Sequence, residues 1–145
     1  MKVVIIGGGA GGISTASNIR KLDEEIEITV LTRDKYVSYS PCAIPYVIGN
    51  TIPSFEDIVM RSPEDYEAKN IDLHLETEVT AVDHEKKEIT YTKDGKESKM
   101  KYDKLVLTTG GSPFIPPMKG VDLDGVFKIR TLDDGKTVKE WLICW

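Results

Sequence analysis

The fold of this chain is decided near its start by the stretch Lys2-Val3-Val4-Ile5-Ile6-Gly7-Gly8-Gly9-Ala10-Gly11-Gly12, which joins a β-branched run to a glycine-rich turn. In such a turn Gly7 permits the sharp change of direction, Gly9 lets the backbone approach a pyrophosphate, and Gly12 lets helix and strand pack closely. The helix beginning near Ala10 offers free N–H groups and its positive dipole end to phosphates. The pattern predicts a dinucleotide-binding turn; the alternative reading is a structural turn without a ligand.

The residues after the turn supply the context that this motif requires. Ala16, Ile19 and Leu22 recur at helical spacing, and a second apolar strand follows over Ile26–Leu31. Strand, glycine turn, helix and strand within about thirty residues make up the βαβ unit of dinucleotide-binding folds. We therefore predict an α/β fold of the Rossmann type with a parallel sheet.

A change of period to two marks the later part of the chain. Alternating residues predict strands, and Asp94-Gly95 is typical of a hairpin turn, so an antiparallel β-meander is inserted into the fold. The mostly apolar run Lys104–Thr108 predicts a buried parallel strand. The alternating strands are Ile71–Leu75, Val79–Val82, Glu88–Thr92 and Ser98–Tyr102.

Two further helices are predicted from their capping residues. Ser62 precedes a proline and two acidic residues, which predicts a short helix over Pro63–Lys69 with Ser62 as its N-cap. Thr131, with Asp134 three residues later, predicts a capped helix that runs to Trp145.

Composition and charge exclude several classes of function. By length, the 145 residues form one domain with a sizeable core. The net charge of -5 arises from interspersed acidic and basic residues, whereas nucleic acid requires a clustered basic surface. No apolar run is long enough to span a membrane, and the N-terminal run is too short for a signal peptide. We expect a cytoplasmic protein that binds neither nucleic acid nor membranes.

The cysteines and histidines form no framework of their own. Cys42 and Cys144 lie far apart in sequence, and in a reducing compartment each is a free thiol. His74 and His84 have no partner at metal-ligand spacing, so no metal site is predicted. The apolar ending Trp141–Trp145 is what a truncated domain or fragment has.

Cys42 is the candidate reactive group. With Ser40 as N-cap and Pro41 as first helical residue, its sulfur lies in the first turn of a helix, where unpaired N–H groups favour the thiolate. Pro45 is expected to keep this helix short. The alternative reading is that Cys42 is a small buried hydrophobe.

These segments together resemble the N-terminal FAD-binding part of the pyridine nucleotide-disulfide oxidoreductases. The resemblance is to the single-cysteine branch, which contains coenzyme A disulfide reductases, NADH oxidases and NADH peroxidases. The matching segments, in the family's order, are Gly7-x-Gly9-x-x-Gly12, Ile19–Asp23, Ser38-x-x-x-Cys42 followed by Pro45–Gly49, Glu78–Ala81, Tyr102–Gly110 and Arg130–Leu132.

The resemblance implies a chain of electron transfers. NADH or NADPH reduces FAD, and FAD reduces oxidised Cys42, which is a mixed disulfide with a small thiol or a sulfenic acid. The terminal acceptor is then a small disulfide such as coenzyme A disulfide, a peroxide or oxygen. The two-cysteine relatives carry a second cysteine where this chain has Val47, so Cys42 acts alone.

By matching position, the resemblance also assigns binding residues. Thr32 replaces the acidic residue that usually accepts hydrogen bonds from the adenosine ribose; it can still accept one, whereas a carboxylate accepts two in charge-assisted fashion. A thiol carrier such as coenzyme A would meet Lys21 and Ser38 beside Cys42. The implied FAD contacts are Gly7, Gly9, Ala10, Gly11, Gly12, Thr32, Arg33, the backbone of Val79, Thr109, Gly110 and Arg130.

The family pattern extends beyond this chain. Residues 1–145 match the N-terminal part of a discontinuous FAD-binding domain, and the nicotinamide-binding and dimerisation domains are absent. We expect the full-length form to be a homodimer and the chain alone to bind FAD weakly without turnover. Two other hypotheses stay open: a non-catalytic nucleotide-binding module, and an oxidoreductase of the flavin monooxygenase type that does not use Cys42.

Overall fold

The computed structural model describes residues 1–144 and divides into two compact units. The first, here called the sheet unit, comprises residues 1–38 and 61–110, and the second, the helical unit, comprises residues 39–60 and the chain from 111 onward. The length of the chain predicted one domain. In the second unit, residues 39–60 pack with the C-terminal helix.

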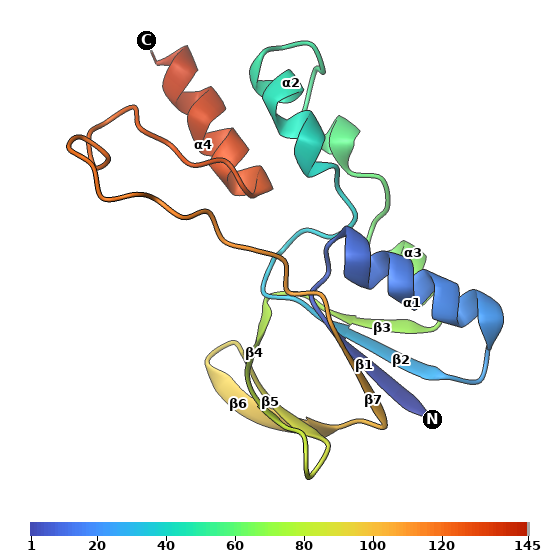
Figure 1. The fold of residues 1–145 in the computed structure, drawn as a ribbon. Coiled ribbons are helices and arrows are strands. Elements are labelled where there is room, and N and C mark those ends of the chain that lie inside the picture. The colour runs from blue at the N-terminus through green and yellow to red at the C-terminus, as the bar shows by residue number, and fades with distance from the viewer. Residues whose placement is uncertain (145) are drawn as a thin grey trace. The chain divides into compact units, whose positions relative to one another are not determined.

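The sheet unit is built on four parallel strands (Figure 1), and the parallel sheet predicted from the βαβ pattern is confirmed. The segment Ile71–Leu75, which alternation placed among the strands of the meander, instead pairs in parallel with the second strand of that unit. In the register of the sheet, Ile6 is paired with both Leu31 and Leu107, and Leu31 is paired with His74. These are the last residues of their strands, so the carboxyl ends of the four strands lie at one edge of the sheet. The strands, in the spatial order β3-β2-β1-β7, are β3 (Ile71–His74), β2 (Glu27–Leu31), β1 (Lys2–Ile6) and β7 (Lys104–Leu107).

Helix α1 (Ala10–Leu22) covers one face of this sheet (Figure 1). It buries Ile13 and Ala16 against β-branched residues of β1 and β2 that point to the same side. Helix α3 (Glu64–Glu67) adds the buried ring of Tyr66 to this core. It is shorter than predicted, and Ser62 is not its cap: Pro63 is the N-cap residue, and the Ser62 N–H donates to the Asp65 carboxylate.

The predicted antiparallel meander covers the other face of the sheet. It consists of β4 (Thr77–Asp83), β5 (Glu88–Lys93) and β6 (Lys96–Lys101). The β5–β6 hairpin turns at Asp94-Gly95, where both residues have positive φ, as predicted. Ile89 and Tyr102 are buried with Val4, Ile6 and Leu31 in the core between meander and sheet.

Strand β7 differs from its prediction in burial. Its apolar run predicted a strand enclosed on both sides, but β7 is an edge strand of the described sheet, and Leu107 is 64 % exposed. An apolar run indicates that a strand is compatible with burial. Whether the strand is buried depends on the neighbouring strands and helices, which the run does not specify.

The helical unit contains short helices and one longer one. They are the 3₁₀ helix η1 (Pro41–Ala43), α2 (Ile44–Ile48), the 3₁₀ helix η2 (Glu56–Ile58) and α4 (Leu132–Ile143). α2 and α4 pack together, and the buried side chains of the unit are Ile44, Val47, Phe55, Ile58 and Leu132. The predicted end of α4 at Trp145 lies outside the described residues.

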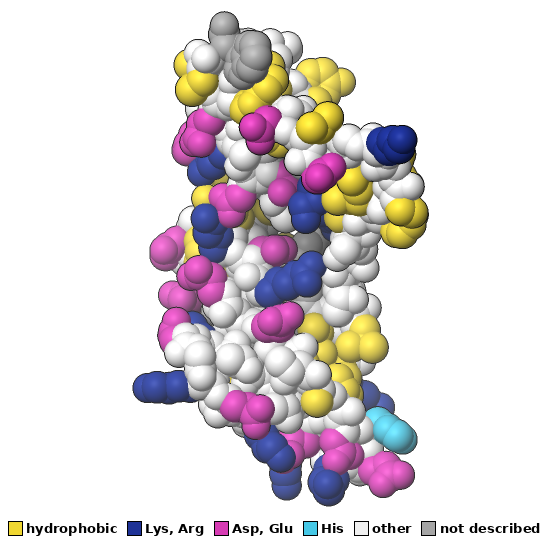
Figure 2. Space-filling view, turned by 90° about the vertical axis from the view of Figure 1, so that its left-hand side faces the viewer, with side chains coloured by type: hydrophobic (Ala, Val, Ile, Leu, Met, Phe, Trp, Pro, Cys, Tyr) yellow, Lys and Arg dark blue, Asp and Glu magenta, His cyan; other side chains and the backbone are white. Residues whose placement is uncertain are grey.

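Within the described residues, no helix is both long and apolar enough to cross a membrane. Acidic and basic side chains are mixed on the face that Figure 2 presents. Residues 1–144 contain no group of three His, Cys, Asp or Glu side chains that could hold a metal ion.

Candidate functional site

The glycine turn after β1 has a geometry that only glycine fits at two positions. Gly7 has φ +112°, and a Cβ there would lie 2.2 Å from the carbonyl oxygen of Thr108. A Cβ on Gly12 would lie 1.9 Å from the carbonyl oxygen of Gly7. Gly7 therefore lets the chain turn beside β7, and Gly12 lets α1 pack directly onto the turn.

The outer side of the same turn is open. No heavy atom lies within 4 Å of a Cβ built on Gly9, and Gly9, Ala10 and Gly11 are exposed. The first bond within α1 runs from the Ile13 N–H to the Gly9 carbonyl at 3.0 Å, so the preceding N–H groups point out of the helix end. With no acidic side chain in the first turn, this end suits a phosphate.

Thr108 supports the turn, and the sequence analysis did not single it out. Its N–H donates to the Ile6 carbonyl at 2.8 Å, and its hydroxyl lies 3.0 Å from the same oxygen and 3.1 Å from that of Gly7. The signal was present in the sequence, because a threonine ends an apolar strand immediately before Thr109 and Gly110. Those two residues are exposed at the carboxyl edge, where Gly110 has positive φ.

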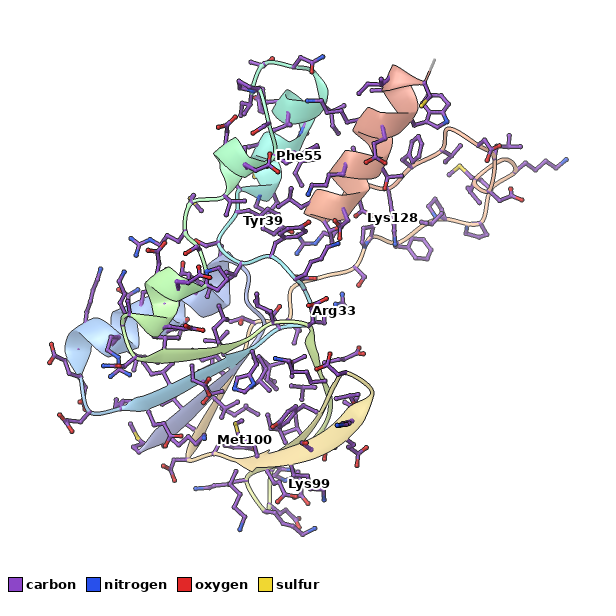
Figure 3. All side chains as sticks on the ribbon, turned by 180° about the vertical axis from the view of Figure 1, so that it is seen from behind. Arg33, Tyr39, Phe55, Lys99, Met100 and Lys128 are labelled. Atoms are coloured by element: carbon purple, nitrogen blue, oxygen red, sulfur yellow. The ribbon has the colours of Figure 1, made fainter. Side chains whose placement is uncertain are left out.

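Thr32 and Arg33 follow β2 at the same edge, next to the glycine turn. The Gly7 N–H donates to the Leu31 carbonyl at 2.8 Å, which places the end of β2 beside the turn. Thr32 is only 4 % exposed, because its methyl group packs against Gly8 and its hydroxyl oxygen accepts the Asp34 N–H at 3.3 Å. Arg33 is exposed, as Figure 3 shows at this edge. The Thr32 side chain thus has little free surface.

Val79 lies in β4, the outer strand of the meander. Its side chain packs against the meander core, and a bulge follows it between Val79 and Ala81. Within the described residues β4 pairs with β5 along one side, and at its start the Thr77 N–H donates to the Thr32 carbonyl at 2.8 Å.

The structure does not bring Lys21 to the glycine turn. It is exposed in the last turn of α1, at the opposite end of the helix from Gly9. A helix of 13 residues is about 20 Å long, which separates Lys21 from the phosphate end. Ser38 is the last residue of the sheet unit, half-buried with φ +55°.

Cys42 lies in the helical unit, and its side chain is exposed as a free thiol. It is the middle residue of η1, so the prediction of a helical first turn is confirmed, although the turn is a 3₁₀ helix. Ser40 is the N-cap residue of this turn and Pro41 its first helical residue, as predicted, but the Ser40 side chain makes no capping bond, and its N–H donates to the Ile58 carbonyl at 3.0 Å. Exposure also contradicts the alternative reading of Cys42 as a buried hydrophobe.

The helix that begins at Pro41 is short, as predicted, since η1 ends at Ala43. Pro45 itself lies in the first turn of the following helix, α2, where proline needs no N–H partner. The helix ends after Ile48, where the Gly49 N–H donates to the Pro45 carbonyl at 2.9 Å.

Arg130 precedes α4, whose N-terminus carries the predicted capping box. The Asp134 N–H donates to the Thr131 hydroxyl at 3.2 Å, and the Thr131 N–H donates to the Asp134 carboxylate at 2.8 Å. Arg130 is exposed, and its Nε donates to the Gly111 carbonyl at 3.0 Å. Partial burial alone would raise the pKa of Asp134, but hydrogen bonds from the Thr131 and Arg130 N–H groups and the Thr131 hydroxyl lower it overall.

Comparisons with known proteins agree with this arrangement. The chain is 53% identical over 144 residues to an NADH oxidase of Methanocaldococcus jannaschii, covering 98% of this chain and 32% of that protein. It is 33% identical over 144 residues to a coenzyme A disulfide reductase of Staphylococcus aureus, and the match covers 97% of this chain and 32% of that protein. The solved structure of an NAD-dependent persulfide reductase from A. fulgidus superposes on this chain with a TM-score of 0.92 at 35% sequence identity. The match covers 97% of this chain and 27% of that one.

The chain thus spans about a third of the length of the curated relatives it matches. A model of the pyridine nucleotide-disulphide oxidoreductase family matches residues 1–142, which include the glycine turn, Cys42 and most of α4. The match covers nearly the whole chain, and the structural likeness confirms the predicted Rossmann-type α/β fold. We conclude that the chain belongs to the pyridine nucleotide-disulphide oxidoreductase family.

Proposed function

We propose that the chain is the N-terminal part of the FAD-binding domain of an NAD(P)H-dependent flavoenzyme that reduces a small disulfide through Cys42. The observation that carries the proposal is the exposed thiol of Cys42 at the start of the η1–α2 element. Coenzyme A disulfide is the first candidate substrate, because a relative of that printed activity is 33% identical over this region.

The glycine turn fits the pyrophosphate of FAD. Its outer side has room for a ligand at Gly9, and the N–H groups at the start of α1 point into that space. FAD, when bound, accepts the hydride of NADH or NADPH and supplies two electrons. The residues assigned to it are Gly7, Gly9, Ala10, Gly11, Gly12, Thr32, Arg33, the Val79 backbone, Thr109, Gly110 and Arg130.

Cys42 carries the sulfur chemistry in two steps. In the first, its thiolate attacks one sulfur of the disulfide, the S–S bond breaks, and one small thiol leaves after taking up a proton. In the second, two electrons break the mixed disulfide, the second small thiol leaves with a proton, and Cys42 returns to the thiolate. The sum is one disulfide plus two electrons and two protons giving two thiols. Lys21 and Ser38 are assigned to the thiol carrier.

A second candidate reaction is favoured by the 53% identity to an NADH oxidase. Here the Cys42 thiolate attacks a peroxide oxygen, the O–O bond breaks, and the leaving oxygen takes a proton to become water. Two electrons and one proton then reduce the resulting sulfenic acid to thiolate and a second water. Both reactions need Cys42 and differ only in the oxidised partner.

The remaining two thirds of the full-length protein are proposed to supply the nicotinamide-binding domain, the rest of the FAD-binding domain and a dimerisation domain. The protein is proposed to be a cytoplasmic homodimer acting on small molecules. Its activity therefore has to be measured on the full-length polypeptide.

The test compares full-length wild type with Cys42→Ser, using Cys144→Ser as the control because both thiols are exposed. We expect wild type and Cys144→Ser to retain FAD and to oxidise NADH or NADPH with coenzyme A disulfide or peroxide. Cys42→Ser should retain FAD and lose at least about 10³-fold in turnover, as loss of a nucleophile does. FAD-dependent turnover that survives in Cys42→Ser would support the monooxygenase-type alternative. Nucleotide binding without turnover in wild type would support the non-catalytic module.

A further inference from the structure

Gly135 occupies an unexpected place in the interior of α4. Glycine destabilises a helix interior relative to alanine, so a glycine there requires a reason. Gly135 is not among the glycines with positive φ, so its backbone conformation does not provide one. It is buried, which directs attention to its neighbours.

Its neighbours belong to the segment that carries Cys42. A Cβ built on Gly135 would lie 2.6 Å from Cγ2 of Ile44 and 2.9 Å from Cε1 of Phe55, which Figure 3 labels. Ile44 begins α2, and Phe55 is the N-cap residue of η2. The backbone of α4 thus touches both side chains directly, and glycine is what allows this approach.

Both sides of this contact are held in place. On the α4 side, the Thr131–Asp134 capping box fixes the first turn, and the Gly135 N–H donates to the Thr131 carbonyl at 3.2 Å. On the other side, Ile44 is 1 % exposed and β-branched, and such a residue has one strongly preferred rotamer in a helix. Ile44 cannot turn its methyl group away cheaply, so the contact fixes its backbone.

The backbone of Ile44 is directly linked to Cys42. The Ile44 N–H donates to the Pro41 carbonyl and closes η1, and Cys42 is the middle residue of that turn. Because the Cys42 side chain is itself exposed, its location depends on the packing beneath the turn. That packing consists of Ile44 against Gly135.

We propose that Gly135 is a positioning residue for Cys42: by letting α4 approach Ile44, it sets where the η1 turn holds the sulfur. The inference rests on the proposed function, in which Cys42 is the reacting group. A methyl group at position 135 needs a shift of about 1 Å to reach ordinary carbon–carbon separation. A misplacement of that size at a reacting group slows a reaction by about 10²-fold.

The experiment uses the full-length protein and the variant Gly135→Ala. The control is Thr137→Ala, in the same helix, where the side chain is exposed and its hydroxyl bonds only to the Asp133 carbonyl of α4. The readouts are bound FAD, the long-wavelength absorption band between the Cys42 thiolate and FAD, and kcat and KM for disulfide reduction. For Gly135→Ala we expect unchanged FAD content, loss of most of the band, and a kcat lower by about 10²-fold with KM within about threefold. The control should match wild type.

A double-variant comparison traces the effect to the contact and remains measurable if Gly135→Ala folds poorly. Ile44→Ala removes Cγ2, the nearer of the two atoms that the new Cβ would meet and the one linked to the Cys42 turn. Adding Gly135→Ala to Ile44→Ala should therefore change band and kcat by less than about threefold. An equal loss in both backgrounds would overturn the positioning role, as would a Gly135→Ala variant with the band and kcat of wild type. A wild-type protein with neither FAD nor the band would instead overturn the proposed function, and this inference with it.

Discussion

At the scale of single residues, two glycines of one turn have opposite surroundings. Gly12 has no room for a Cβ, which would meet the Gly7 carbonyl at 1.9 Å, whereas Gly9 faces open space. Substitution by alanine is therefore expected to affect folding stability at Gly12 and ligand binding at Gly9. Gly12→Ala should lower the free energy of unfolding by about 1–3 kcal/mol or more, because overpacking displaces α1 from the turn.

The matched change, Gly9→Ala, should cost under about 1 kcal/mol, since the residue is an N-cap with free space around it. It should weaken FAD binding, because the new methyl group occupies the surface where the pyrophosphate approaches. Urea unfolding and FAD titration of the full-length protein measure the two effects. Equal stability losses in the two variants would contradict the packing described for Gly12.

Single residues also show what the sequence could not disclose. Roles for Cys42 and the glycines could be predicted from the sequence because the predictions depend on residue type and spacing. The position of Thr108 at the end of an apolar strand was visible as well, but the contacts of Thr108 and Gly135 are with residues about 100 and 90 positions away in sequence, Gly7 and Ile44. No local pattern specifies such contacts, so only the structure shows them.

At the scale of elements, the capping box of α4 makes a prediction about pH. Hydrogen bonds from Thr131 and Arg130 outweigh partial burial and lower the pKa of Asp134 in the folded state. A carboxyl group whose pKa is lowered by folding contributes stability above its unfolded pKa, near 3.9, and loses it as pH falls through the folded value.

The variant Asp134→Asn removes this contribution. At neutral pH the free energy of unfolding of this variant should be lower than that of wild type by about 0.5–2 kcal/mol, the usual cost of losing a cap. The difference from wild type should shrink below pH 4, because wild type then loses the same carboxylate. Urea unfolding of the full-length protein at several pH values measures it, with the exposed Asp124→Asn as control. A difference that stays constant down to pH 2 would contradict the assignment.

Elements were predictable where local periodicity decides them. The βαβ unit, the meander with its Asp94-Gly95 turn and the Thr131 cap all follow from short-range patterns, and all are present. The capping bonds assigned to Ser40 and Ser62 are absent: the Ser40 side chain makes no bond to η1, and Pro63 takes the N-cap position of α3. The residue type alone therefore did not decide whether the side chain would bond to the helix end.

At the scale of the whole molecule, the helical unit exposes many large apolar side chains. Phe114 is 84 % exposed, Leu123 66 % and Ile143 76 %. Patches of this kind on a protein surface favour association or contact with further protein. We therefore expect residues 1–145 alone to bind the dye ANS with a several-fold rise in fluorescence and to self-associate in sedimentation experiments.

The full-length protein should show much less dye binding per chain, because its further two thirds are proposed to cover this surface. The triple change Phe114→Ser, Leu123→Ser and Ile143→Ser should lower dye binding of the short chain, while the change of exposed Leu22→Ser in the sheet unit should not. Dye binding by the full-length protein equal to that of the short chain would contradict this expectation.

The chain passes between its two units after residues 38, 60 and 110, so each unit is assembled from separate stretches of sequence. Residues 39–60, which contain Cys42, follow the first stretch of the sheet unit and precede its second stretch, as an exchangeable cassette would. Yet the cassette packs on α4, which the chain reaches only some seventy residues later. Transplanting it between relatives would therefore disturb the contact between Gly135 and Ile44 unless the matching C-terminal helix were transferred with it.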